Sequence, residues 1–77
     1  MRDARHMKTY VVCLDNSDYP ASLEVRKLYE CISDDRAEGL GQIRVVDESG
    51  EDYLYPSDRF VSVELSEEAA EAVARAA

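Results

Sequence analysis

Residues 42–56 read QIRVVDESGEDYLYP and give the clearest indication of the fold. Ile43–Val46 is a run of mostly β-branched residues and Tyr53–Tyr55 is a second apolar run, so both favour extended strands. Between the two runs lie four acids, Ser49 and Gly50. Glycine supplies the positive φ that a tight hairpin turn needs. The stretch therefore predicts an antiparallel hairpin that turns around Ser49-Gly50.

The residues before this hairpin predict two strands separated by a loop. Lys8–Leu14 alternates apolar side chains onto both faces, which indicates a strand in the interior of a sheet. Asp15–Pro20 is rich in residues that favour turns. A short strand or turn at Leu23–Val25 and a strand at Leu28–Ser33 are expected next. The charged residues of Ala21–Ile32 also suit a helix surface, so that alternative stays open.

Four further segments complete the chain. Ser33–Gly41 holds acids and two glycines and is expected to be a surface connection. After the hairpin, Pro56–Arg59 can form one tight helical turn, and Phe60–Leu65 alternates again as the last strand. Ser66 then suits a helix N-cap, because acids follow it at the positive end of the helix dipole. Glu67–Ala77 is rich in alanine and is predicted to be a helix.

These elements indicate one mainly β domain. The 77 residues suffice for one domain with a thin core. About five short antiparallel strands suit a small barrel, and a short C-terminal α-helix follows them. We expect residues 1–7 to be a disordered N-terminal extension, residues 8–65 to form the barrel, and residues 66–77 to form an acidic, alanine-rich helical tail.

The order of the elements resembles that of SH3-like barrels. The run Gly50–Val61 is similar to the glycine, Pro-Ser and aromatic signature that closes eukaryotic Src-homology domains. The span Lys8–Leu65 also resembles a family of short bacterial proteins of uncharacterised function, through Ile43–Pro56 and, earlier, Ala21–Glu24 and Lys27-x-Tyr29. The resemblances imply a small SH3-like barrel from a bacterium. The chain lacks the tryptophan with which the eukaryotic modules line their groove for proline-rich peptides.

The charge of the chain constrains its partners. Nine Lys and Arg stand against seventeen Asp and Glu, which gives a formal net charge of −8 at pH 7. Phosphate backbones and anionic lipid surfaces repel such a chain, so a nucleic acid and a membrane are both disfavoured as partners. A basic protein partner fits better, and plain solubility is the other explanation of the charge. Because small barrels often bind RNA or DNA, a nucleic-acid-associated protein is the alternative function.

The sequence predicts no catalytic residue, no cofactor and no metal site. Its one histidine is His6, in the expected extension, and Cys13 and Cys31 are too far apart for a zinc pair. The acids of Asp47–Asp52 do not follow the spacing of a calcium loop, so we expect an exposed hairpin tip kept soluble by charge. No signal peptide or membrane-spanning stretch is visible, so we expect a cytoplasmic protein whose two thiols are free core residues.

The aromatic residues are the best indication of function. Five tyrosines in so small a chain exceed what burial alone explains, and tyrosine is enriched where proteins bind each other. Tyr53 and Tyr55 share one face of a strand, either as an interface or as packing at the edge of the core. We therefore predict a non-catalytic protein-interaction or regulatory module.

The resemblance also implies where such a module binds. In SH3-like barrels the acidic loop lies beside the Pro-Ser turn. Rigid aromatic and proline surfaces supply contact area there, and acids steer a basic partner. The predicted binding site consists of Tyr19, Tyr55, Pro56 and Phe60, with a rim of Asp15, Asp18 and Asp58. The competing interpretation places Phe60 in the core.

Overall fold

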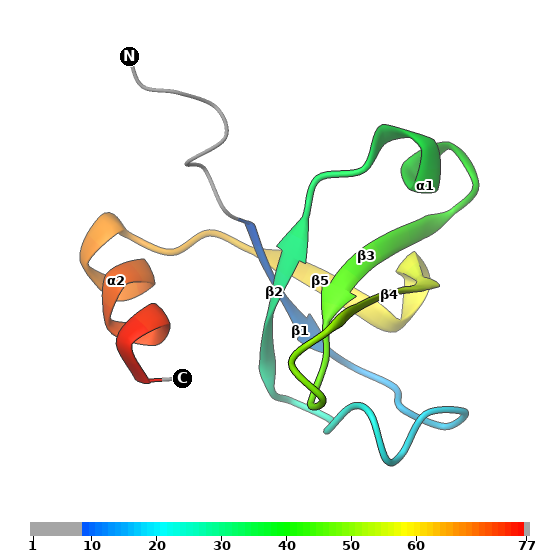
Figure 1. Cartoon of the computed structure of the whole chain (residues 1–77), viewed down its shortest axis with the longest axis horizontal. Helices are drawn as coiled ribbons and strands as arrows, with labels where there is room; N and C mark the ends of the chain where they lie inside the picture. The colour runs from blue at the N-terminus through cyan, green and yellow to red at the C-terminus, as the bar shows by residue number, and fades with distance from the viewer. Residues whose placement is uncertain (1–8, 77) are drawn as a thin grey trace.

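A computed structural model describes residues 9–76 of the chain (Figure 1). Five strands form one antiparallel sheet: β1 (Thr9–Cys13), β2 (Leu28–Ile32), β3 (Gln42–Val46), β4 (Asp52–Pro56) and β5 (Phe60–Val63). The helices are α1 (Asp35–Gly39), a 3-10 turn (η2, Ser57–Arg59) and α2 (Glu67–Ala76). The mainly β prediction with a C-terminal helix is therefore confirmed. The expected extension of residues 1–7 lies outside the described residues.

The strand order in the sheet is β4-β3-β2-β1-β5. β1 pairs with β2 on one side and with β5 on the other, so the predicted interior position of the first strand is confirmed. A barrel closes only when the two outermost strands of its sheet pair with each other. Here β4 and β5 remain the two edges, so the five predicted antiparallel strands form an open sheet and not a closed barrel.

The hairpin of β3 and β4 has the predicted form. Ile43 lies opposite Tyr55, and Val45 lies opposite Tyr53. Gly50 has a φ of 86°, which is the left-handed conformation that glycine adopts without strain. In the ambiguous segment Ala21–Ile32, the strand predicted at Leu28–Ser33 is confirmed as β2, and residues 21–27 form turns and loop rather than a helix. The turn η2 follows Pro56 as predicted.

The connection between β2 and β3 differs from the prediction, because it contains the short helix α1. Asp34 is its N-cap, and Asp34 Oδ1 accepts a hydrogen bond of 3.0 Å from the Ala37 N–H. The guanidinium of Arg44 on β3 binds Asp34 at 2.9 Å and Asp52 at 2.9 Å. One arginine therefore ties the start of α1 to β3 and β4.

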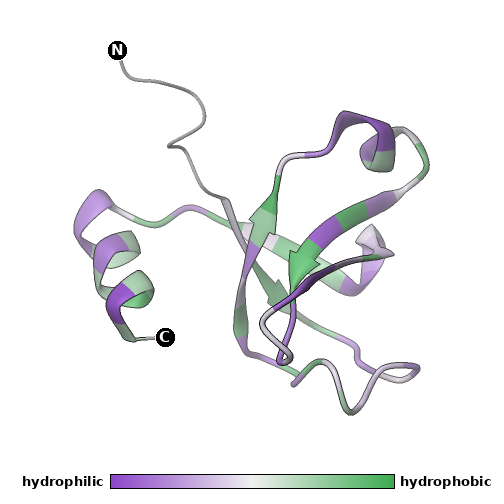
Figure 2. Cartoon of the chain, viewed as in Figure 1, coloured by the Kyte–Doolittle hydropathy of each residue, from purple (hydrophilic) through white to green (hydrophobic). Residues whose placement is uncertain are grey.

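The core lies between the inner face of the sheet and the loop that joins β1 to β2. Its buried members are Val11, Cys13, Leu23, Tyr29, Val45, Tyr55 and Phe60. Leu23 comes from the loop itself and is completely buried. Both cysteines are free thiols, as predicted, with Cys13 buried and Cys31 partly buried. Figure 2 shows the apolar residues gathered in the strands, whereas α1 is mostly hydrophilic.

The C-terminal helix begins as predicted. Ser66 Oγ accepts a hydrogen bond of 3.0 Å from the Ala69 N–H, which is the N-cap contact. None of the described residues of α2 is buried. In Figure 1 the helix stands beside the sheet rather than on top of the core. It therefore contributes little to the apolar burial that stabilises the domain.

Candidate functional site

Three of the four predicted aromatic and proline site residues form one ring cluster. The ring centroids of Tyr19 and Tyr55 lie 4.9 Å apart with the planes at 89°, and those of Tyr55 and Phe60 lie 6.1 Å apart. These are edge-to-face contacts of the favourable kind. Tyr55 and Phe60 are, however, buried members of the core. Of the predicted set, only Tyr19 and Pro56 offer aromatic or proline surface to a partner.

The predicted acidic rim is partly neutralised by the protein itself. Arg59 Nη2 donates to Asp18 Oδ2 at 2.6 Å, and its guanidinium lies 5.8 Å from the centre of the Tyr19 ring. Hydrogen bonds from Ser17 lower the pKa of Asp15. Asp58 is exposed on η2 and has no hydrogen-bond or ion-pair partner among residues 9–76. The Tyr19 ring therefore has two neighbours, the Arg59 guanidinium and the Tyr55 ring.

Asp47 is the main site residue that the sequence interpretation missed. The expected role of this acid was to keep an exposed hairpin tip soluble, but its exposed fraction is only 6%. Asp47 Oδ2 accepts from the Tyr55 hydroxyl at 2.6 Å, and Oδ1 accepts from the Ser49 hydroxyl at 2.6 Å and from the Ser49 N–H at 2.9 Å. Asp47 can be buried as a carboxylate because hydrogen-bond donors surround it, and burial without such donors would cost free energy.

The pKa values of this pair reflect the same contacts. Burial on its own raises the pKa of Asp47, but the hydrogen bonds from Ser49 and Tyr55 together outweigh it and leave the pKa below its ordinary value. Burial, together with the bond to Asp47, raises the pKa of Tyr55 to about 12. At neutral pH Asp47 is therefore an ionised carboxylate and Tyr55 is a neutral phenol.

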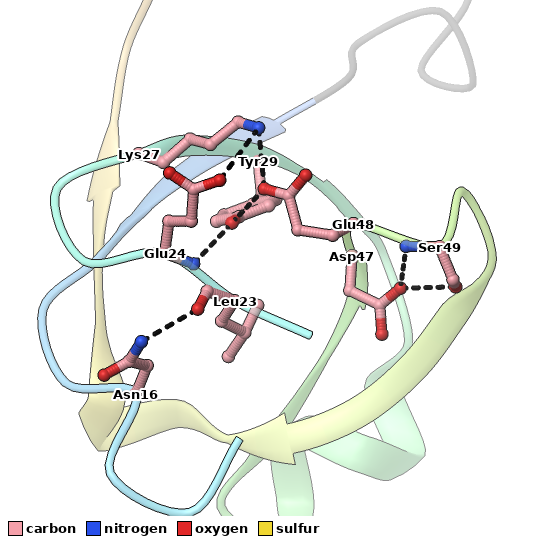
Figure 3. Close-up of polar contacts among 8 residues, drawn as sticks. All are labelled: Asn16, Leu23, Glu24, Lys27, Tyr29, Asp47, Glu48 and Ser49. Atoms are coloured by element: carbon pink, nitrogen blue, oxygen red, sulfur yellow. Dashed lines mark hydrogen bonds and ion pairs between the residues drawn. The ribbon is translucent and has the colours of Figure 1, made fainter. Parts of the chain in front are cut away.

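Glu48 fastens the hairpin to the loop between β1 and β2 (Figure 3). Glu48 Oε2 accepts from the Tyr29 hydroxyl and lies 2.6 Å from Lys27 Nζ. The Tyr29 hydroxyl in turn accepts from the Glu24 N–H at 2.7 Å, and the Glu48 N–H donates to the Ser22 carbonyl at 3.0 Å. The contacts with Lys27 and Tyr29 lower the pKa of Glu48. These contacts therefore join the loop to the hairpin.

A groove of about 400 Å³ opens between this loop and β4. Its lining consists of Tyr19, Ser22, Asp47, Ser49, Tyr53, Leu54 and Tyr55. Tyr53 is 50% exposed, and its hydroxyl donates to Glu51 Oε1 at 3.0 Å. Leu54 is 41% exposed. The groove therefore has exposed aromatic and aliphatic walls over a floor of buried, hydrogen-bonded polar groups.

Sequence reasoning identified part of this groove. The shared face of Tyr53 and Tyr55 was visible from their spacing, and Tyr19 belonged to the predicted site. The spacing did not show that Tyr55 turns into the core while Tyr53, nearer the hairpin tip, stays exposed. Pro56 and Phe60 do not line the groove.

A second groove, of about 680 Å³, lies between α2 and the strands β1 and β2. Tyr10 and Leu28 contribute to its sheet wall, and Val73 and Ala76 to its helix wall. Within residues 9–76, nothing shows what would fill it.

The described part of the chain, residues 9–76, contains no cluster of three or more His, Cys, Asp or Glu that could hold a metal ion. Within the same residues, neither α1 nor α2 has the length and apolar character needed to cross a bilayer. Comparison of the chain with protein-family models, curated proteins and solved structures finds no match. The resemblance to SH3-like barrels and to short bacterial proteins therefore stays an expectation from the sequence.

Proposed function

We propose that this chain is a small, non-catalytic protein-interaction module of the cytoplasm, and that it binds a segment of a basic protein partner in the groove between the β1–β2 loop and β4. The observation that carries the proposal is the exposure of Tyr53 and Leu54 beside Tyr19 in a pre-formed groove. Exposed tyrosine supplies a large contact area at a low entropic cost.

The rigidity of the groove supports a binding role. Asp47 and Glu48 join the hairpin to the loop by hydrogen bonds that are already formed. The Tyr19 ring contacts the Tyr55 ring edge to face and lies near the Arg59 guanidinium. A partner therefore binds without ordering these side chains first, which lowers the entropic cost of association.

The direction of the pKa shifts supports a role without catalysis. A general acid or base works best with a pKa near neutrality. Burial raises the pKa of the Cys13 and Cys31 thiols, and hydrogen bonds lower those of Asp47 and Glu48. Every shift among the described carboxyls, thiols, tyrosines and cations moves a pKa away from neutrality.

A display selection of random peptides on the immobilised full chain tests the proposal. We expect binders enriched in basic and apolar residues, and we expect Tyr53→Ala to weaken them about tenfold or more in calorimetric titration. Leu40→Ala is the matched control, because Leu40 is 71% exposed beside α1, away from the groove. Binders that Tyr53→Ala and Tyr19→Ala leave unaffected would place the binding surface elsewhere.

Gel shifts with the same full chain test the alternative function, which is nucleic-acid binding. Low-salt gel shifts with mixed DNA and RNA oligonucleotides are expected to show no complex, because the net charge of −8 repels phosphate. A salt-sensitive complex that forms while no peptide is selected would replace the proposed function with the alternative one.

A further inference from the structure

The edge strand β4 presents backbone groups that no other strand uses. In an antiparallel pair, opposed residues alternate between those that exchange hydrogen bonds and those that do not. The Asp47 N–H donates to Glu51 at 3.1 Å, and the Ser57 N–H donates to Gly41 at 3.0 Å. These two bonds lie at either end of the β3–β4 ladder and fix its phase.

The phase determines which groups face outward. Glu51 and Ser57 take part in those two bonds, and every second residue between them also bonds to β3. These residues are Tyr53 and Tyr55. Asp52 and Leu54 alternate with them, so their N–H and C=O groups point away from β3. No backbone or side-chain group within residues 9–76 bonds the Leu54 N–H. Leu54 therefore offers a free donor and a free acceptor on the edge that borders the groove.

The surroundings of this edge favour one kind of occupant. Glu51 and Asp52 lie at one end of β4, and Asp58 follows its other end. Arg44, the cation on the neighbouring strand, is already held by Asp34 and Asp52. Asp52 is neutralised by Arg44, so Glu51 and Asp58 supply the negative charge at the two ends of the edge, and within residues 9–76 neither has a cationic partner. Tyr53 and Leu54 make the centre of the edge apolar.

We infer that an extended peptide with alternating basic and apolar residues adds to the free edge of β4 as a sixth strand. This inference rests on the proposed function and specifies how the partner binds. Side chains of a strand alternate between two faces. The apolar side chains of the peptide lie in the groove against Tyr53 and Tyr19, and its basic side chains lie on the opposite face and are attracted by the acids at the two ends of β4. Main-chain hydrogen bonds to Leu54 set its register.

A second copy of this chain is a poorer occupant. Two β4 strands that pair across a two-fold axis would bring together two chains of net charge −8, with their acidic strand ends close to each other. If sedimentation detects a dimer that Leu54→Pro abolishes, the second copy occupies the edge and the inference is wrong.

The test uses a capped synthetic peptide that alternates lysine and valine. Two versions of this peptide carry methyl groups on alternate backbone nitrogens. In one version the methylated nitrogens are those that face β4, in the other they are those that face away, and both versions keep the same amino-acid composition. We expect the unmethylated peptide to bind and only one methylated version to bind about tenfold or more weakly, because it loses its hydrogen bonds to β4. A peptide that alternates glutamate and valine is expected not to bind.

Protein variants check the same contact from the other side. Leu54→Pro removes the outward N–H together with the side chain, whereas Leu54→Ala removes only the side chain. We expect the proline variant to bind the lysine–valine peptide at least several-fold more weakly than the alanine variant.

Equal affinities of the two methylated peptides overturn strand addition even if Leu54→Pro fails to fold. If the two methylated peptides bind equally well and Tyr53→Ala still weakens binding, the groove binds the peptide without strand addition, and the proposed function stands. If the unmethylated peptide does not bind, strand addition is wrong, and the display selection decides the proposed function separately.

Discussion

The buried pair of Asp47 and Tyr55 provides the sharpest test of the structure. Asp47→Ala removes the acceptor of three hydrogen bonds, one from the Tyr55 hydroxyl and two from Ser49. Tyr55→Phe removes only the hydroxyl and keeps the ring that packs against Tyr19 and Phe60. The double variant removes both partners of one bond.

The contacts give the size of the effect. A hydrogen bond to a charged group contributes about 1.5–3 kcal/mol, and a buried donor left without its acceptor costs about 1–3 kcal/mol. We therefore expect Asp47→Ala to lower the free energy of unfolding by about 3–4 kcal/mol and Tyr55→Phe by about 1–2 kcal/mol. A domain of this length has a total of roughly 4–12 kcal/mol, so the first loss is a large fraction of it.

Urea denaturation of the wild type, both single variants and the double variant completes the cycle. We expect a coupling energy of about 1.5–3 kcal/mol between the two positions. Glu51→Ala is the matched control, because Glu51 is an exposed acid of the same hairpin, and it should leave the free energy of unfolding almost unchanged. Additive effects of Asp47→Ala and Tyr55→Phe would mean that the two side chains do not interact, and the reasoning about the groove floor would be wrong.

Three further predictions concern stability. Leu23→Ala, at a completely buried side chain, is expected to lower the free energy of unfolding by about 2–5 kcal/mol in urea denaturation; a loss below about 1 kcal/mol would show that the loop does not complete the core. Cys13→Ser and Cys31→Ser are expected to cost about 1–3 kcal/mol through buried polarity, with the larger loss at the fully buried Cys13; thermal melts check this, and an unchanged Tm in both variants contradicts it. The pKa values of Asp47 and Glu48 are lowered in the folded state, so the unfolded chain takes up protons first as the pH falls. The free energy of unfolding should therefore decline as the pH drops below about 4.5, less steeply in Glu48→Gln; parallel pH profiles of this variant and the wild type would refute the role of that carboxylate.

Local signals were enough to predict the β3–β4 hairpin. Its two apolar runs and Gly50 act over neighbouring residues, and the register in the structure agrees with them. The N-cap at Ser66 was predictable for the same reason. The Ser66 side chain accepts a hydrogen bond from the N–H of Ala69, which is only three residues away.

The features that sequence reasoning missed depend on longer-range contacts. Asp47 resembles the other acids of the turn in sequence, and its burial follows from the position of Tyr55 on the opposite strand. The helix α1 has an Asp N-cap in sequence, but five residues form no stable helix alone, and Arg44 on β3 helps to hold it. The open edge of β4 depends on how far the sheet curves, which residue patterns do not specify.

If the groove beside β4 is the binding surface of the protein, a bound peptide changes the surroundings of the residues that line this groove. Amide chemical-shift mapping of the isotope-labelled chain, during titration with the lysine–valine peptide, measures this change residue by residue. We expect the largest shifts to fall on Tyr19, Tyr53 and Leu54 and to saturate together. Largest shifts on α1 or in the groove beneath α2, or no shifts at all, would contradict it.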